Sequence, residues 1–327
     1  MHHDGLQNRV LRLSKPQRGS FKSFKLKHVA PQHCKATEVR VATDCVGLNF
    51  RDVLIALNRY PEKDVSIGLE FSGRVLPNGH ENSHFAVGDR IFGMALGSFA
   101  SQLVVPACAV AKYPSYLSPQ LAAGLPVAYT TAWHGIIEIA KLRAGQTILI
   151  HNGTGGVGMA SIHLAQKIGA RVIATAGSAE KRRYLNEMGV EFALDSRNEG
   201  FAKHVLNITD GRGANVVIGA LPPKLSRENI DAISSGGHFV DMGKNVDLDK
   251  AKIYYLRPDI RHTSMNLGLS ATEDPQWAGN ILRKLCTKLS THSLPHLPIR
   301  MYSIHEAEQA FRFLTKSQHI GKVVLRF

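Results

Sequence analysis

Short apolar runs alternate with amphipathic segments through the middle of the chain, between Gly145 and Gly243. This alternation is typical of a parallel β-sheet whose strands are joined by crossover helices. The runs are rich in Val, Ile, Leu or Phe and are bounded by Gly, Asp or Ser, and they predict strands at residues 147–151, 171–175, 192–195, 216–218 and 238–242. Five strands with intervening helices predict an α/β domain with a doubly wound sheet.

The segments between these strands have the spacing of amphipathic helices. From Val157 to Ile168, four apolar or small residues recur at steps of four, three and four, and Gly169 offers a stop. Residues 180–188 end in the same way, and residues 225–233 run on into two serines and two glycines. We therefore expect crossover helices in these three places.

The two ends of the chain have a different pattern. The first 110 residues or so contain short β-like runs, such as residues 38–46 and 102–105, separated by Gly, Pro, Asn and His. From about Pro275 a helical stretch, a Pro-rich turn, a second helix at residues 305–316 and a final strand at residues 322–327 are expected. The pattern predicts a β-rich domain before the doubly wound one.

A glycine loop joins the first predicted strand to the first predicted helix, and it contains Gly-x-Gly-x-x-Gly. In this motif the first glycine turns the chain, the second lets the backbone approach a pyrophosphate, and the third lets helix and strand pack closely. The helix N-terminus then faces the phosphates with unpaired N–H groups. A turn without a ligand is the alternative, and the flanking strand and helix argue against it. The predicted cofactor contacts here are Gly153, Thr154, Gly155, Gly156, Val157 and Gly158.

The second predicted strand indicates which dinucleotide is bound. NAD-binding folds carry an Asp or Glu about 20 residues after the loop, at the end of this strand. Here the strand ends without an acid, while Ser178, Lys181 and Arg182 offer one hydroxyl and two positive charges to a 2′-phosphate. This favours NADP(H). Two alternatives stay open: the basic pair is a solvated helix face, or Glu180 binds the ribose.

Composition narrows the class of protein. The 327 residues are 44% hydrophobic, enough for a substantial core, and carry a formal net charge of +14. The basic residues are spread along the chain, densest from Arg9 to Lys27, without interleaved aromatic residues, so we expect no nucleic-acid partner. A basic surface suits a phosphorylated cofactor or an acidic carrier protein equally well. The cysteines lack the paired spacing of zinc or disulfide sites and are Cys34, Cys45, Cys108 and Cys286. No signal peptide or membrane span is recognisable, so a soluble cytoplasmic protein is expected.

Several motifs together resemble one family. They are the glycine loop with Gly47-Leu48-Asn49-Phe50-Arg51-Asp52, Gly68-Leu69-Glu70-Phe71-Ser72-Gly73, Val87-Gly88-Asp89-Arg90, Thr130-Thr131-Ala132-Trp133, Gly237-His238-Phe239-Val240-Asp241-Met242-Gly243-Lys244 and His319-Ile320-Gly321-Lys322. The chain resembles the medium-chain dehydrogenase/reductase superfamily over nearly its whole length. Within it, the chain is most similar to the enoyl reductase domains of polyketide synthases and animal-type fatty acid synthases.

That resemblance implies a GroES-like substrate domain at residues 1–115, a Rossmann NADP-binding domain at 116–265, and a return to the substrate domain at 266–327. Zinc-dependent members carry a ligand His where this chain has Leu69, and leucine cannot bind zinc. We therefore expect no metal site.

The implied reaction is hydride transfer from NADPH to the β-carbon of a 2-enoyl thioester, followed by protonation at the α-carbon. The thioester would be held on the phosphopantetheine arm of an acyl carrier protein, beside other synthase domains. Lys244 is the implied proton donor or oxyanion partner, and Tyr60 lies where some family members carry a tyrosine that affects protonation. The resemblance adds cofactor contacts at Asn49, Thr131, Gly219, Ala220, Leu221, Met242 and Gly243.

Two departures from the family pattern leave alternatives open. Asn266 stands where related domains often have an aspartate, and an asparagine orients groups but exchanges no proton at neutral pH. Gly219 and Ala220 replace a common Asn-Ser pair, which removes a side-chain contact. A free-standing quinone or enone reductase, and a catalytically weakened binding domain, are therefore alternative hypotheses. The oligomeric state is open.

Overall fold

The chain forms two compact units in the computed structural model, which describes residues 9–16, 19–62, 65–77, 84–197, 200–220, 226–243 and 250–327. The first unit is Met1–Thr130 with Leu267–Phe327, and the second is Thr131–Asn266. Residues 116–130, which the motif pattern assigned to the cofactor domain, cluster with the first unit. The reason lies in helix α2 (Pro119–Ala123), which packs on the first unit's sheet and whose Pro119 carbonyl accepts a hydrogen bond from Ser72 Oγ at 2.7 Å.

The second unit is built on a six-stranded parallel sheet with the order β10-β9-β8-β11-β12-β13. Its strands are β8 (Thr147–Ile150), β9 (Arg171–Ala176), β10 (Phe192–Asp195), β11 (Ala214–Gly219), β12 (Ile233–Asp241) and β13 (Arg261–Ser264). The chain starts in the middle of the sheet, winds outward to one edge, and then returns to wind toward the other. This is the strand order of dinucleotide-binding folds, so the predicted doubly wound α/β class is confirmed.

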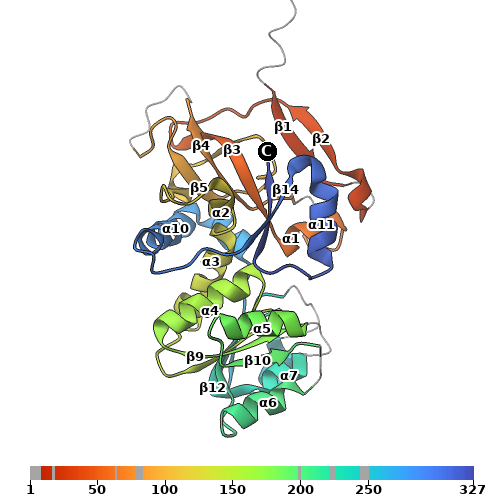
Figure 1. Cartoon of the computed structure of the whole chain (residues 1–327), viewed down its shortest axis with the longest axis vertical. Coiled ribbons are helices and arrows are strands. Elements are labelled where there is room, and N and C mark those ends of the chain that lie inside the picture. The colour runs from red at the N-terminus through yellow and green to blue at the C-terminus, as the bar shows by residue number, and fades with distance from the viewer. Residues whose placement is uncertain are drawn as a thin grey trace, which may run out of the picture. The chain divides into compact units, whose positions relative to one another are not determined.

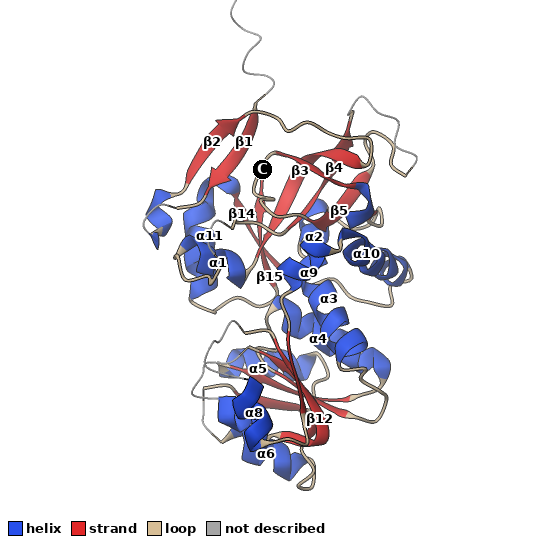
Figure 2. Ribbon diagram, turned by 180° about the vertical axis from the view of Figure 1, so that it is seen from behind, coloured by secondary structure: helices blue, strands red, loops and turns tan. Residues whose placement is uncertain are grey.

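Helices cover both faces of this sheet (Figures 1 and 2). They are α4 (Gly156–Ile168), α5 (Ala179–Glu187), α6 (Phe201–Ile208), α7 (Ser226–Asp231) and α8 (Lys250–Leu256), preceded by a π-helical segment, His134–Ile139. Alternate strand residues serve opposite faces: Ile148 and Ile150 of β8 pack with α4 and α5, whereas Leu149 packs with α6 to α8. Two apolar layers thus enclose the sheet.

The five predicted strands are present, and the structure adds a sixth. Strand β13 has the polar sequence Arg-His-Thr-Ser, which does not show the apolar run typical of a buried strand. It pairs with β12 as an edge strand. The helix expected at residues 225–233 ends at Asp231, because Ile233 already begins β12.

The first unit is β-rich. Its seven-stranded sheet has the order β14-β15-β3-β4-β5-β7, with β6 also paired to β3. These strands are β3 (Glu38–Leu48), β4 (Glu70–Leu76), β5 (Arg90–Met94), β6 (Gln102–Pro106), β7 (Val110–Lys112), β14 (Ile299–Ser303) and β15 (Lys322–Arg326). Strand β15 pairs with β3, so the last residues of the chain complete the sheet begun by residues 38–48.

A separate two-stranded hairpin and several helices pack around this sheet (Figure 1). The hairpin consists of β1 (Val10–Ser14) and β2 (Lys25–Val29), with the 3-10 turn η2 (Phe21–Ser23) between them. The other elements are α1 (Phe50–Ala56), η3 (Ala107–Ala109), α2, α3 (Pro126–Trp133), α9 (Leu267–Glu273), α10 (Pro275–Ser290), η6 (Ile304–Glu306) and α11 (Ala307–Thr315). Within the described ranges, no helix combines the length and the apolar character needed to cross a membrane.

Candidate functional site

The glycine loop forms a tight, buried turn between β8 and α4 of the second unit. Asn152 enters it with a positive φ of 52°, and the Gly153 N–H donates to the Thr175 carbonyl at 2.8 Å. A Cβ atom on Gly158 would collide with the Asn152 carbonyl oxygen, and one on Gly155 would lie 2.7 Å from Asn152 Nδ2. The close approach of the Gly158 backbone to the Asn152 carbonyl therefore requires glycine at position 158, as the motif predicts for its third glycine.

Thr154 lies in this loop and supplies a test of whether a dinucleotide fits. Its side chain is fully buried, yet Oγ1 has no hydrogen-bond partner among the described residues. A buried hydroxyl left unpaired costs about 1–3 kcal/mol, so such groups normally have a partner. The loop stands at the N-terminus of the 13-residue helix α4, where backbone N–H groups attract phosphate. The loop therefore fits a pyrophosphate that would pair with the Thr154 hydroxyl.

A cluster of basic side chains lies at the ends of β9 and β10. The Ser178 hydroxyl caps α5 by accepting from the Lys181 N–H at 3.3 Å. Burial and, next, the positive charge of Arg197 lower the pKa of Lys181. Because these two cations repel each other, an anion between them would stabilise both.

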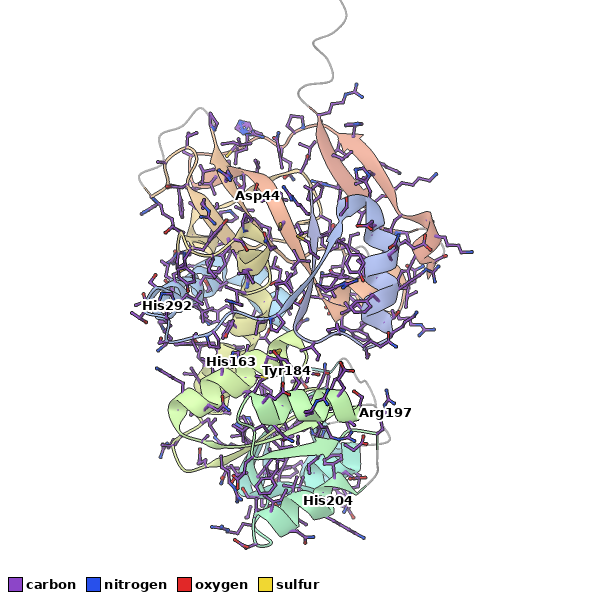
Figure 3. The ribbon with its side chains drawn as sticks, viewed as in Figure 1. Asp44, His163, Tyr184, Arg197, His204 and His292 are labelled. Carbon is purple, nitrogen blue, oxygen red and sulfur yellow. The ribbon has the colours of Figure 1, made fainter. Side chains whose placement is uncertain are left out.

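Two arginines at this edge behave differently. Arg182, expected beside the phosphate, is held by Asp195 at 2.9 Å and by the Ala176 carbonyl at 3.3 Å. Arg197 follows β10 and is labelled in Figure 3. Its Nε lies 3.1 Å from the point that a Cβ on Gly177 would occupy. Sequence reasoning missed Arg197, although its place just after a strand of the parallel sheet puts it at the same edge as Ser178.

The carboxyl ends of β11, β12 and β13 bring together further predicted residues. The Met242 N–H donates to the Gly219 carbonyl at 3.0 Å, and the Met265 N–H donates to the Asp241 carbonyl at 2.8 Å. Gly219, Met242, Gly243 and Asn266 therefore lie at the ends of three adjacent strands. The turn at Gly243 is fixed by its N–H, which donates to Asp241 Oδ1 at 2.7 Å. Ala220 is exposed beside Gly219, and Leu221 and Lys244 fall outside the described residues.

His151 explains why glycine occupies position 219. A Cβ on Gly219 would lie 2.5 Å from the His151 Cβ, so a larger residue would displace the imidazole. That ring is buried between Thr175 Oγ1, 3.2 Å from Nδ1, and Asn229 Oδ1, 2.7 Å from Nε2. The His151 ring is thus held by contacts inside the second unit, and its Cβ leaves no room for a side chain at position 219.

Acid is expected to destabilise the second unit through three of its histidines. Burial lowers the pKa of His151, His163 and His238 to about 4, from an ordinary 6.5. These rings gain protons on unfolding, so the free energy of unfolding should fall as pH drops from about 6.5 toward 4, and above 6.5 they should contribute no slope. Urea titrations at several pH values measure this slope. A His151→Gln variant should reduce it by up to about 1.4 kcal/mol per pH unit. An unchanged slope would refute the assignment.

The first unit contains a buried polar network around Asn49. Lys322 Nζ lies 2.6 Å from Glu70 Oε1 and 2.6 Å from Asn49 Oδ1, and it donates to the Leu48 carbonyl at 3.1 Å. Asn49 Nδ2 donates to Glu70 Oε1 at 2.9 Å and to the Gly47 carbonyl at 3.4 Å. The two donor hydrogens of the Asn49 amide are therefore used inside the protein. The network links β3, β4 and β15.

Glu70 and Asp52 extend this network to neighbouring helices. Glu70 Oε2 accepts from the Val127 N–H at the start of α3, at 2.8 Å. Asp52 accepts from the Asn49 and Gly68 N–H groups at 2.9 and 2.8 Å. Burial raises the pKa of Asp52, against the opposing effects of the Arg51 guanidinium and these two amides. The motif residues of this unit thus hold its elements together.

The remaining candidates are placed as follows. Tyr60 is half-buried against the first unit's core, with the Arg51 guanidinium carbon 5.3 Å from its ring centroid. Thr131 is buried on α3, at the first residue of the second unit. Leu69 packs in an apolar cluster, and the described part of the chain has no group of three or more His, Cys, Asp or Glu side chains that could hold a metal ion.

Two family models match the chain. The model described as an alcohol dehydrogenase GroES-like domain matches residues 35–115. The one described as a zinc-binding dehydrogenase matches residues 156–278. Together they cover strands β3 to β7 of the first unit and most of the second unit.

Individual proteins are similar over nearly the whole chain. A phenolphthiocerol/phthiocerol polyketide synthase of Mycobacterium tuberculosis is 34% identical over 98% of the chain, which spans only 15% of that relative's length. The structure of the CurK enoyl reductase is 29% identical, with a TM-score of 0.92 over 97% of this chain and 99% of that one. A quinone oxidoreductase from Pseudomonas syringae is 25% identical, with a TM-score of 0.88 over 97% and 100%.

Proposed function

This chain belongs to the medium-chain dehydrogenase/reductase superfamily and is an oxidoreductase domain of the enoyl reductase kind, and from that premise we propose that it reduces enoyl thioesters with NADPH. The substrate would be a 2-enoyl group on the phosphopantetheine arm of an acyl carrier protein. Neighbouring synthase domains are the proposed partners, since the relatives are polyketide synthases of which this chain spans a small part.

The cofactor proposal rests on the side chains at one edge of the sheet, where the glycine loop and the ends of β9 and β10 lie. The buried Thr154 hydroxyl has no hydrogen-bond partner among the described residues, and burial and, next, the positive charge of Arg197 lower the pKa of Lys181. Phosphate groups would relieve both features, a pyrophosphate at the loop and a 2′-phosphate at the cations. In NAD-binding folds a carboxylate at the end of this strand binds the ribose hydroxyls, and β9 ends without one. Ser178 and Lys181 lie there instead, and they suit the 2′-phosphate of NADP(H).

The reaction would divide between cofactor and protein. Bound NADPH supplies a hydride for the β-carbon of the substrate. The Met242 N–H donates to the Gly219 carbonyl at the ends of β11 and β12, and the Gly243 N–H donates to Asp241 Oδ1 one residue before Lys244 in the sequence. We propose that Lys244 stabilises the thioester oxygen as negative charge develops there, or protonates the α-carbon. Asn266, at the end of β13, would orient these groups, since its amide cannot supply a proton.

Quinone reduction is the rival proposal, because a quinone oxidoreductase has the same fold over the whole chain. The two differ in the acceptor. With crotonyl-pantetheine, NADPH oxidation is expected at a rate well above that with 1,4-benzoquinone. Oxidation with the quinone alone would contradict the proposed substrate, and no oxidation with either acceptor would favour a weakened binding domain.

A Lys244→Ala variant tests the role proposed for that lysine. Loss of one oxyanion-stabilising or proton-donating group typically lowers kcat by about 100- to 1,000-fold. We expect a loss of this size with crotonyl-pantetheine and an unchanged Kd for NADPH, measured by fluorescence titration. Undiminished kcat would remove Lys244 from the reaction.

A further inference from the structure

The N-terminal part of the chain is unusually basic. Between Gly5 and Thr37 there is no Asp or Glu, although the whole chain has 26 acidic residues against 40 Lys and Arg. The same stretch carries Arg9, Arg12, Lys15, Arg18, Lys22, Lys25, Lys27 and Lys35. This segment therefore carries +8 of the formal net charge of +14, and it supplies no residue to the reaction described above.

The β1–β2 hairpin presents part of this charge on its surface. Lys22 of η2 and Lys25 and Lys27 of β2 are exposed, and none of the three makes an ion pair within the described ranges. Lys25 and Lys27 are two residues apart on a strand, so they project from the same face. On that face Lys27 pairs directly across the hairpin with Arg12, a like-charge pair that opposes folding. Stability of the hairpin does not account for these charges.

The hairpin is held firmly beside the loop that contains Tyr60. A Cβ on Gly19, just before η2, would lie 3.0 Å from the carbonyl oxygen of Leu57, which ends α1. Helix α11 packs against both η2 and α1, with the Phe24 and Phe311 ring centroids 4.5 Å apart. Both ribbon views show β1 and β2 beside α11 and α1 (Figures 1 and 2). The lysines are thus part of a fixed surface next to the substrate-domain loop at residues 57–62.

We propose that Lys22, Lys25 and Lys27, here called the lysine ridge, are the docking surface for the acidic face of the carrier protein that delivers the thioester. This rests on the proposed function. Exposed ion pairs are individually weak and form quickly, which suits a carrier that must bind and leave in every turnover. A nucleic acid fits less well, because the hairpin's aromatic rings, Phe21 and Phe24, pack against Phe311 and are not free to stack on bases.

The test compares one acyl group on two carriers. Crotonyl-pantetheine needs no docking surface, whereas crotonyl loaded on an acidic acyl carrier protein does. For a Lys22→Glu/Lys25→Glu/Lys27→Glu variant, we expect the KM for the loaded carrier to rise about tenfold at low salt. The kcat, and the KM for crotonyl-pantetheine, should stay unchanged. For the wild type, raising NaCl from about 20 mM to about 200 mM should increase the carrier KM, and this dependence should weaken in the variant.

A matched control changes the same charge elsewhere. Lys167, Lys203 and Lys316 are exposed and lie outside the hairpin, so their triple substitution by Glu alters the net charge equally. An equal rise in carrier KM in this control, or no rise in the ridge variant, would overturn the proposal.

Direct binding separates this proposal from the proposed function. The Kd of the unloaded carrier protein for wild type and ridge variant is measured without turnover, so the ridge remains testable if neither crotonyl substrate is reduced. A weaker Kd in the ridge variant supports docking. Tighter binding of a short single-stranded RNA than of the carrier at about 150 mM NaCl, lost in the ridge variant, would identify the ridge as a nucleic-acid site and overturn the inference.

Discussion

A Lys322→Met variant is expected to lose about 3–5 kcal/mol of unfolding free energy, because it leaves the Glu70 carboxylate buried without its partner. Glu70 is fully buried and lies 2.6 Å from the Lys322 ammonium, which also binds Asn49 and the Leu48 carbonyl. Removing one ion of a buried pair is far more costly than removing an exposed one. Urea denaturation followed by circular dichroism measures the loss.

Two further variants show whether the uncompensated charge is the cause. Lys316→Met removes an exposed lysine of the same unit and should change stability by less than about 0.5 kcal/mol. Adding Glu70→Gln to Lys322→Met should restore part of the lost stability, since the lone charge is gone. A deficit that the double variant shares in full would contradict this explanation.

The second large effect expected is on cofactor preference. If Lys181 and Arg197 hold the 2′-phosphate, each contributes hydrogen bonds to a charged group, worth about 1.5–3 kcal/mol. Lys181→Ala or Arg197→Ala should therefore lower kcat/KM for NADPH by about 10- to 150-fold, and the value for NADH should change little. Steady-state kinetics with the two cofactors give the ratio.

The same helix offers a control for this experiment. Arg183 lies on α5 beside Arg182, and its exposed side chain is 3.9 Å from Glu187. An Arg183→Ala variant should keep the NADPH preference. If Lys181→Ala and Arg197→Ala lower the values for NADPH and NADH by the same factor, these residues do not distinguish the cofactors.

Local sequence patterns were sufficient for the core of the second unit. The five predicted strands combine apolar residues with flanking turn residues, and the glycine loop carries a motif whose backbone geometry requires glycine. Strand β13 was not predicted because its sequence, Arg-His-Thr-Ser, contains no apolar residue. A strand at the edge of a sheet can form with little apolar surface. The start of β12 was missed for another reason: Ser234 to Gly237 has the composition of a turn, and the pairing of β11 with β12 shifts there, from Ile233 directly to His238.

The site depends on contacts that no local pattern contains. Lys322 and Asn49 are separated by 273 residues, and their contact follows from the pairing of β15 with β3. Arg197 joins Lys181 only because β9 and β10 are neighbours in the sheet. Arg182 was expected at the phosphate, but the side chain of Asp195 on the same neighbouring strand holds it. The sequence thus indicated which residue types belong to the site, but only the fold shows which side chains contact one another.

The central claim is hydride transfer from NADPH to the β-carbon of an enoyl thioester. It is tested most directly with NADPH carrying deuterium on the transferable position of the nicotinamide and with crotonyl-pantetheine as acceptor. Mass spectrometry and NMR of the product should find butyryl-pantetheine with one deuterium on its β-carbon. Unreduced crotonyl-pantetheine, or a butyryl product without deuterium at that carbon, would contradict the claim.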